Sequence, residues 1–323
     1  MVRRVLGLVP DPLVRLLIVA IVLATIAPVR GRAHDVAQFV SATAVFMLFL
    51  LNGLRLPRRE VVAGLSNLRL LAPLLAWVFG AMTLAGLGLS HLAGMFLPVT
   101  VATGFLFLGA LPSTVQSATA YSSLAGGNVA ASVIAAAVTN ILGVFVTAPL
   151  FTALAGGRAG GIDASGIVKV ATILLLPFAI GQIAQGRFGH IVREHRQLAT
   201  WMDRTSIAIA VYVAFSGAVV AGLWTLVSLG DWALVLALVA GFLVLGFGGA
   251  WLLGGALRLD RPTRITMLYA GGQKSIAMGA PLAAVLFKPD VAGMILVPVL
   301  VYHLSQLVIS APLATRLNRA AAA

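Results

Sequence analysis

Long apolar blocks run through most of the sequence, and each block ends at arginine, proline, glycine or aspartate. About 20 helical residues span the hydrocarbon core of a bilayer, and the blocks have about that length or more. The pattern predicts an all-α polytopic membrane protein with ten transmembrane helices. The predicted helices cover residues 13–28, 36–54, 66–89, 95–125, 128–153, 165–186, 201–227, 231–257, 264–287 and 290–313.

Two of these blocks contain helix-breaking residues near their middle. The fourth block carries LPST at residues 111–114, and the ninth carries AGGQKS at residues 270–275. Proline removes a backbone hydrogen bond and glycine weakens a helix, so both segments are expected to unwind near the middle of the membrane. Unwound backbone at that depth must be buried in protein or line a watery cavity.

The positions of these breaks reveal an internal repeat. Ser113 and Gln273 mark breaks about 160 positions apart, and Asn128 and Asp290 begin two further blocks 162 positions apart. We therefore predict two five-helix repeats, residues 1–157 and 158–323, without a separate soluble domain. Five is an odd number, so the second repeat is inverted in the membrane. Matching broken helices in inverted repeats are typical of secondary transporters.

Composition supports a membrane location. Hydrophobic residues make up 60% of the chain and charged residues only 10%, whereas soluble domains have about 25% charged residues. The chain contains no cysteine, which excludes disulfides, thiolate catalysis and cysteine-ligated metals. The net charge of +13 comes from arginines scattered between apolar blocks rather than from one basic face, so no nucleic-acid partner is expected.

The basic residues instead predict orientation. One side of the predicted helices holds Arg3, Arg4, Arg55, Arg58, Arg59, Arg187, Arg193, Arg196, Arg204, Arg258, Arg261, Arg264, Arg316 and Arg319. The opposite side holds only Arg30, Arg32, Arg158 and Lys288. The positive-inside rule then places both termini in the cytoplasm, and we expect a bacterial inner-membrane protein. The N-terminal block has a basic start like a signal peptide, but the repeat requires it as the first helix.

Charge inside the predicted helices is confined to very few positions. All nine acidic residues fall at block ends or between blocks, although cation-coupled transporters commonly hold the cation with a buried carboxylate. Lys274 is the charged group expected near mid-membrane, where a charge costs at least about 2.5–3.5 kcal/mol. Three interpretations remain open: a structural plug that donates to backbone carbonyls, a snorkelling side chain, or a functional group that binds an anion or takes up a proton.

Polar residues gather after the fourth-block break. Hydroxyl and amide groups there would either line a pathway or cap helices and bond between them; they are Ser113, Thr114, Gln116, Ser117, Thr119, Ser122 and Ser123. In the fifth block Ser132, Thr139 and Asn140 share one helical face, and Asn140 is expected to face the break. His303, beside Tyr302, Ser305 and Gln306, is a weaker signal for a packing residue or a proton relay. No enzyme motif occurs, so no catalytic residues are predicted.

Two segments together carry a family resemblance. They are GALPSTVQSATAYSSLAGGNVAASVIAAAVTNILGVFVTAPL at residues 109–150 and GGQKSIAMGAPLAAVLF at residues 271–287. They resemble the bile acid:sodium symporter superfamily, and more narrowly its SBF-like branch. The resemblance implies a core domain and a panel domain, crossed discontinuous fourth and ninth helices, and alternating access through motion of one domain against the other.

The resemblance also maps the family's sodium ligands. Gln273 matches the family's glutamine, Ser132 matches a fifth-helix hydroxyl, and Ser117 or Thr119 falls near the fourth-helix ligands. The family's glutamate, however, is replaced by Tyr269, the asparagine after the glutamine by Lys274, and a second fifth-helix hydroxyl by Ala136. At 4 Å an ammonium would repel sodium by about 4 kcal/mol with an effective dielectric constant of 20, which disfavours a sodium site.

We therefore expect a secondary active transporter that moves a small organic or other anionic solute across the lipid bilayer, with no cofactor. Lys274 would replace or modify the sodium site. The candidate substrate- and ion-binding residues are Ser113, Thr114, Gln116, Ser117, Thr119, Ser132, Asn140, Tyr269, Gln273, Lys274 and Ser275. The alternatives are a sodium-coupled symporter of a bile-acid-like anion, a cation or metalloid exporter, and a non-transporting scaffold or sensor. The sequence leaves the oligomeric state open.

Overall fold

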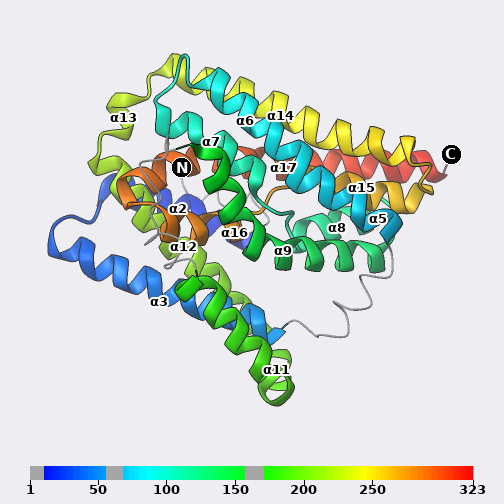
Figure 1. Ribbon diagram of the computed structural model, residues 1–323, viewed down its shortest axis with the longest axis horizontal. Helices are drawn as coiled ribbons and strands as arrows, with labels where there is room; N and C mark the ends of the chain where they lie inside the picture. Colours follow the sequence, from blue (N-terminus) through cyan, green and yellow to red (C-terminus); the bar gives the residue numbers. More distant parts are fainter. Residues whose placement is uncertain (1–10, 56–67, 157–170, 323) are drawn as a thin grey trace. The chain divides into compact units, whose positions relative to one another are not determined.

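The structure is a computed structural model that describes residues 11–55, 68–156 and 171–322. Every regular element within these ranges is helical, as the all-α prediction requires (Figure 1). Six helical segments of the described chain are long and apolar enough to cross a membrane. They are Arg32–Arg55, Leu68–Ala93, Val129–Ala155, Arg196–Val220, Leu229–Ala256 and Pro289–Arg319. Ten spans in two inverted repeats remain a prediction.

Some of the sequence-based expectations fall outside the described ranges. The predicted repeat boundary between residues 157 and 158 lies there, as does the start of the sixth apolar block. The same holds for several charged residues counted above, namely Arg3, Arg4, Arg58, Arg59, Glu60, Arg158 and Asp163.

The described helices form two compact units, each assembled from separate stretches of the chain. Unit 1 contains α2 (Pro12–Ile26), α3 (Arg32–Arg55), η2 (Ala171–Leu175), α11 (Leu176–Glu194), α12 (Arg196–Val220), α13 (Leu223–Leu226) and residues 280–296. Unit 2 contains α5 (Leu68–Leu75), η1 (Ala76–Ala81), α6 (Met82–Ala93), α7 (Val99–Ala110), α8 (Gln116–Leu124), α9 (Val129–Ala155), α14 (Leu229–Ala256), α15 (Arg261–Gly272), residues 276–279 of α16 (Ile276–Leu286) and residues 297–322 of α17 (Pro289–Ala322).

Unit 1 is built on the packing of α3 against α11 and of α12 against α2 and α3. Gly53 and Gly181 allow α3 and α11 to approach closely, because a Cβ atom at Gly53 would lie 2.3 Å from the carbonyl oxygen of Phe178. Such small residues are characteristic of helix contacts in lipid, where close packing rather than water exclusion drives association.

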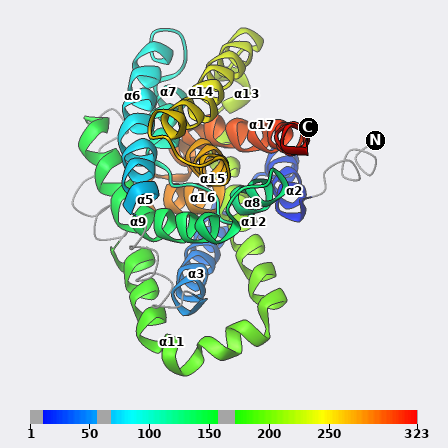
Figure 2. The same ribbon diagram turned by 90° about the vertical axis from the view of Figure 1, so that its right-hand side faces the viewer.

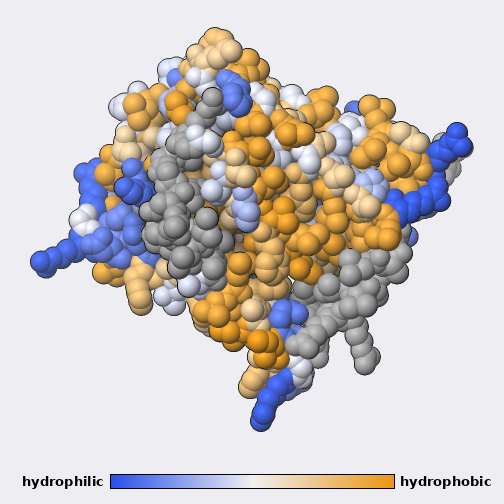
Figure 3. All heavy atoms as spheres, in the orientation of Figure 1, coloured by the Kyte–Doolittle hydropathy of each residue, from blue (hydrophilic) through white to orange (hydrophobic). Residues whose placement is uncertain are grey.

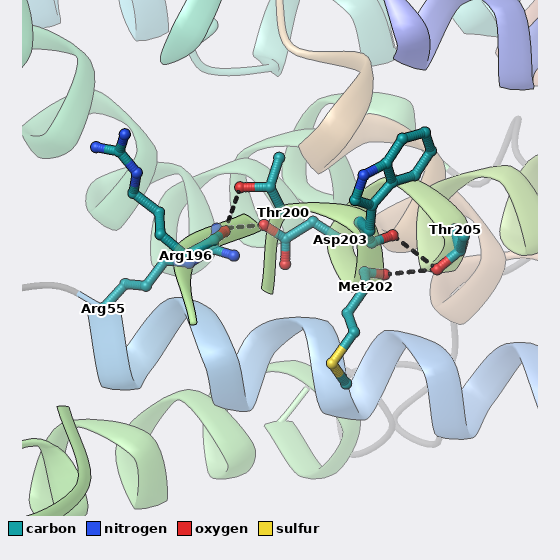
Figure 4. A network of polar contacts seen from close by, with 7 residues as sticks. Arg55, Arg196, Thr200, Met202, Asp203 and Thr205 are labelled. Carbon is teal, nitrogen blue, oxygen red and sulfur yellow. Dashed lines mark hydrogen bonds and ion pairs between the residues drawn. The ribbon is translucent and has the colours of Figure 1, made fainter. Parts of the chain in front are cut away.

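The position of one charged residue in unit 1 differs from the sequence-based prediction. Arg55 of α3 forms an ion pair with Asp203 of α12 (Figure 4). Asp203 was expected at the start of a helix, but α12 begins at Arg196, so Asp203 lies two turns inside it. Residues 187–200, which lie between two predicted helices, are also largely helical, because α11 continues to Glu194 and the chain turns at His195. The charged residues between the two apolar blocks are compatible with a helix, so the observed helices extend beyond the ends that hydropathy predicted.

In unit 2, α6 runs beside α7 and α14 beside α15, while α15 also packs on α8 and α9 (Figures 1 and 2). The third apolar block contains Pro73, and a π-helical turn at η1 follows it, where a regular helix was expected. Buried residues from α5, η1, α9 and α15 form one apolar cluster, which includes Leu74, Val78, Val138 and Met267. This cluster packs η1 together with α5, α9 and α15.

Both predicted helix breaks are present. The helix α7 ends at Ala110 and α8 begins at Gln116, while α15 ends at Gly272 and α16 begins at Ile276. The residues that follow α7 and α15 are extended, with ψ of 146° at both Leu111 and Gln273.

Apolar side chains are also exposed on the outer faces of the helices. Figure 3 shows them over broad areas of the visible face. Examples are Val244 and Leu252 of α14 and Ile183 of α11, each more than two-thirds exposed. Exposed apolar surface of this extent on long apolar helices indicates a lipid environment rather than water.

Candidate functional site

The side chain of Lys274 is buried within unit 2. Its Nζ donates to three backbone carbonyl oxygens, those of Val78 at 3.1 Å, Gly109 at 2.7 Å and Leu111 at 2.8 Å. An ammonium group has three N–H donors, so all three are used. The side chain is 1% exposed, which excludes the snorkelling interpretation and matches the geometry of a plug that donates to carbonyls.

These carbonyl oxygens are available because regular helix stops or deforms beside them. The last carbonyls of a helix lack intrahelical donors, and Gly109 lies in the last turn of α7. Leu111 is extended and is followed by Pro112, which has no N–H. Val78 lies in the π-helical turn η1, where the regular hydrogen-bond ladder is interrupted. Lys274 therefore fills a gap that three irregular backbone segments create together.

The two breaks lie in direct contact. The amide of Ser275 donates to the carbonyl oxygen of Pro112 at 2.9 Å. Each break also caps the helix that follows it: Thr114 Oγ1 accepts from the amide of Ala118 at 3.1 Å, and Ser275 Oγ accepts from that of Met278 at 3.2 Å. Hydroxyl capping satisfies amides that a helix start leaves without partners.

Donors from α9 occupy further carbonyl groups of the first break. Asn140 Nδ2 donates to the carbonyl oxygen of Ser113 at 2.7 Å, which confirms that Asn140 faces the break. Thr147 Oγ1 donates to the carbonyl oxygen of Ala110 at 3.0 Å. Together with Lys274 and Ser275, these groups engage every carbonyl oxygen from residue 109 to residue 113.

Gln273 points to the opposite side of the break from Lys274. Its Oε1 accepts from Thr114 Oγ1 at 2.5 Å and from Ser117 Oγ at 2.6 Å. Its Nε2 donates to Ser310 Oγ of α17 at 3.1 Å. The predicted residues Thr114, Ser117 and Gln273 thus form one largely buried network in which the amide has partners on both sides.

One face of α17 binds the unwound backbone of the second break. Tyr302 Oη donates to the carbonyl oxygen of Gly272 at 2.5 Å. The side-chain amide of Gln306 bonds to both the N–H and the carbonyl oxygen of Lys274, and His303 contacts Gln306. Sequence reasoning treated this face as a weak signal and omitted Tyr302, His303, Gln306 and Ser310 from the candidate residues. The spacing of 302, 306 and 310 in an otherwise apolar block was the signal available.

A second polar cluster joins α8, α9 and α15. Ser132 Oγ lies 2.7 Å from Ser122 Oγ and 2.9 Å from Thr266 Oγ1, and Thr266 Oγ1 donates to the carbonyl oxygen of Asn128 at 3.1 Å. All three hydroxyl side chains are buried. The predicted residue Ser132 therefore belongs to a closed hydroxyl cluster that also contains Thr266, which the sequence reasoning missed.

The remaining candidate residues occupy varied positions. Gln116 is exposed at the start of α8 and lies outside the buried network. Thr119 Oγ1 is buried with no hydrogen-bond partner among the described residues. Tyr269 is fully buried, donates to the carbonyl oxygen of Ser310 at 3.3 Å and stacks on Tyr121 at a centroid distance of 6.2 Å.

The contacts at the two breaks leave a positive charge without a paired acid. No carboxylate of the described chain forms an ion pair with Lys274. No cluster of three histidine, aspartate or glutamate side chains suited to a metal ion occurs in the described ranges either. Burial of an unpaired charge is costly unless hydrogen bonds compensate it, and here the three carbonyl dipoles supply that compensation.

Comparison with known proteins shows similarity over nearly the whole chain. The SBF-like CPA transporter family matches residues 11–319 of the chain. The uncharacterized protein PA2026 of Pseudomonas aeruginosa is 36% identical over 316 residues, which cover 96% of this chain and 93% of that protein. The putative symporter YfeH of Escherichia coli is 33% identical over 312 residues, covering 96% and 93%. The probable sodium/metabolite cotransporter BASS4 of rice is 30% identical over 180 residues, covering 52% and 40%.

The long apolar helices indicate an integral membrane protein, and the family match and the symporter-named relative indicate a transporter rather than an enzyme. The chain belongs to the SBF-like CPA transporter family, as the match over nearly its whole length shows.

Proposed function

We propose that this protein is a secondary active transporter that carries a small organic or other anionic solute across the inner membrane by alternating access. In this proposal Lys274 supplies, within the protein, the positive charge that sodium supplies in sodium-coupled relatives. The names given to YfeH, a putative symporter, and to BASS4, a probable sodium/metabolite cotransporter, support carriage of a small solute.

The observation that carries the proposal is the set of three carbonyl oxygens around Lys274 Nζ. Carbonyl groups at the ends of interrupted helices bind the coupling cation in several transporter folds. Here an ammonium group holds such carbonyls at hydrogen-bond distance. A cation that competed for them would have to displace a covalently attached charge.

The same charge favours an anionic solute. The helices α8 and α16 both begin at the breaks, so the positive ends of their dipoles lie there. As an ammonium group, Lys274 adds a positive charge that no acid of the described chain offsets by an ion pair. A site with this electrostatic character stabilises a negatively charged group and repels a cation.

The coupling test uses the purified protein in proteoliposomes. Small organic anions are first screened by thermal shift, and uptake of the best stabiliser is then measured with sodium, potassium or choline outside. We expect equal uptake in the three salts. Uptake that requires a sodium gradient would reject the role proposed for Lys274.

Variants sharpen this test. Lys274→Met removes the charge but keeps an unbranched side chain, and uptake is expected to fall at least about tenfold. Lys288→Met, the same change at an exposed lysine, is expected to retain uptake. The double variant Tyr269→Glu/Lys274→Asn restores the two side chains that the family resemblance places at the sodium site, and it is expected to bind sodium. Unchanged uptake by Lys274→Met would contradict the proposal.

A sodium-coupled symporter is the second candidate, because the rice relative is named a sodium/metabolite cotransporter. The salt comparison above separates the two candidates directly. Stabilisation by cations or metalloids alone would favour an exporter, and the absence of any stabilising solute would favour a scaffold or sensor.

A further inference from the structure

The side chain of Gln306 pairs with the backbone of Lys274 through two hydrogen bonds. Gln306 Oε1 accepts from the Lys274 amide at 2.8 Å, and Gln306 Nε2 donates to the Lys274 carbonyl oxygen at 3.0 Å. A neighbouring strand makes the same two bonds to an extended residue in an antiparallel sheet. Lys274 lies between α15 and α16, outside either helix, so Gln306 replaces the partners that a helix would have provided.

This pairing controls where two neighbouring side chains point. In an extended backbone, successive side chains project to opposite sides. Gln273 accordingly reaches Thr114 and Ser117, whereas Lys274 reaches the three carbonyl oxygens. A rotation of the backbone at Lys274 would remove both side chains from their partners together. Gln306 opposes that rotation, because its two bonds fix the N–H and the carbonyl of the same residue.

His303 holds the amide of Gln306 in place. Because Gln306 Oε1 accepts from the Lys274 amide, its Nε2 is the group that faces His303 Nδ1 at 2.9 Å. An amide nitrogen can only donate, so His303 Nδ1 accepts this bond. The orientation of the Gln306 amide thus has support from two residues, Lys274 and His303.

We propose that Gln306, held by His303, is a positioning residue for transport, acting by fixing the directions of Gln273 and Lys274 in the unwound segment. This proposal rests on the proposed transport function. It assigns Gln306 no contact with the solute, so its loss is expected to lower the maximal rate of transport while the KM for the solute stays nearly unchanged.

The first test compares matched glutamine variants. Gln182 in unit 1 also donates to a backbone carbonyl oxygen, that of Gly53, at 2.6 Å. We expect Gln306→Leu to lose about tenfold in maximal uptake rate, and Gln182→Leu to retain its rate per folded protein. Equal rates for the two variants would overturn the positioning role, since general loss of a buried amide would then explain both.

The second test measures how uptake by the conservative variant Gln306→Glu depends on pH. A protonated carboxyl group offers one acceptor and one O–H donor, which reproduces the pair of bonds made by Gln306, whereas a carboxylate only accepts. Uptake by Gln306→Glu is therefore expected to rise as the pH falls. His303 and Lys274 also contact this site, so the uptake rate of the variant is divided by that of the wild type at each pH. A Gln306→Glu profile parallel to that of the wild type would overturn the proposal.

A third measurement does not depend on transport. Hydrogen exchange in the peptide 269–278 is expected to accelerate in Gln306→Leu relative to the wild type, because the Lys274 amide loses its acceptor. Unchanged exchange would show that Gln306 does not hold the segment and would overturn the inference. If wild-type protein takes up no solute, the transport function and the positioning role both fail, while the exchange result still decides whether Gln306 holds the segment.

Discussion

At the scale of single residues, Lys274 shows how a buried charge is accommodated. A charge near mid-membrane is expensive, and the sequence alone left open whether Lys274 snorkels, plugs or functions. The structure shows an ammonium with each donor matched to one carbonyl oxygen. Hydrogen bonds that involve a charged group contribute about 1.5–3 kcal/mol each, enough together to offset much of the desolvation cost. Snorkelling is excluded because the side chain is buried.

Hydroxyl groups at the breaks also stabilise the fold by donating to buried carbonyl oxygens. Tyr302→Phe removes one hydroxyl and leaves the carbonyl oxygen of Gly272 without that donor, so we expect a loss of about 1–3 kcal/mol in the free energy of unfolding. Tyr212→Phe removes a similar bond to Ala27 at an exposed site, where water replaces it, and is expected to change stability by less than about 0.5 kcal/mol. Unfolding midpoints in detergent compare the two. Equal shifts would contradict this account of Tyr302.

At the scale of helices, the sequence located the breaks but did not resolve which glycines pack closely. Proline and glycine act on the chain locally, so LPST and AGGQKS predicted both interruptions. The GxxxG-like spacing of the glycines at 80–88 and 241–249 predicts close-packing sites. Gly86, Gly246 and Gly249 do have neighbours too near for a Cβ atom, whereas Gly80, Gly88, Gly241 and Gly248 face open space. Glycine spacing cannot show which side a neighbouring helix occupies.

Two glycines on α6 provide a matched comparison. A Cβ atom at Gly86 would lie 2.6 Å from the carbonyl oxygen of Phe105 and 3.0 Å from Gly109 Cα, so Gly86→Ala is expected to push α6 from α7 at a cost of at least about 1–3 kcal/mol. Gly88→Ala meets nothing within 4 Å and is expected to be neutral or to stabilise by about 0.5–1 kcal/mol. The measurement is thermal unfolding of both variants. A greater loss of stability in Gly88→Ala than in Gly86→Ala would contradict the close α6–α7 contact at Gly86.

At the scale of the whole molecule, hydropathy predicted the class of protein and most helices to within several residues. The predicted helix 36–54 is observed as Arg32–Arg55, and 128–153 as Val129–Ala155. The repeat boundary was predicted from matching offsets, whereas the compact units draw helices from both halves of the chain. Symmetry and compactness describe different properties, so the inverted repeat remains a prediction alongside these units.

The predicted orientation is testable because the chain contains no cysteine. Leu229→Cys introduces a thiol at an exposed position predicted to face outward, and Arg319→Cys introduces one at an exposed position predicted to face the cytoplasm. In intact cells a membrane-impermeant maleimide is expected to label only Leu229→Cys, and permeabilisation is expected to expose Arg319→Cys as well. The reverse pattern would invert the predicted topology.

The amino-acid sequence by itself determined that this protein is helical, lies in lipid and interrupts two helices, one of them at Lys274. These properties follow from local composition: runs of apolar side chains, prolines without an N–H, and glycines in helical blocks. Tertiary structure alone decided the partners of each polar group. Lys274 meets carbonyl oxygens 163 to 196 positions away, and Gln306 reaches back 32 positions to its backbone. Folding brings such groups together, because a buried donor or acceptor must find a partner wherever the chain supplies one.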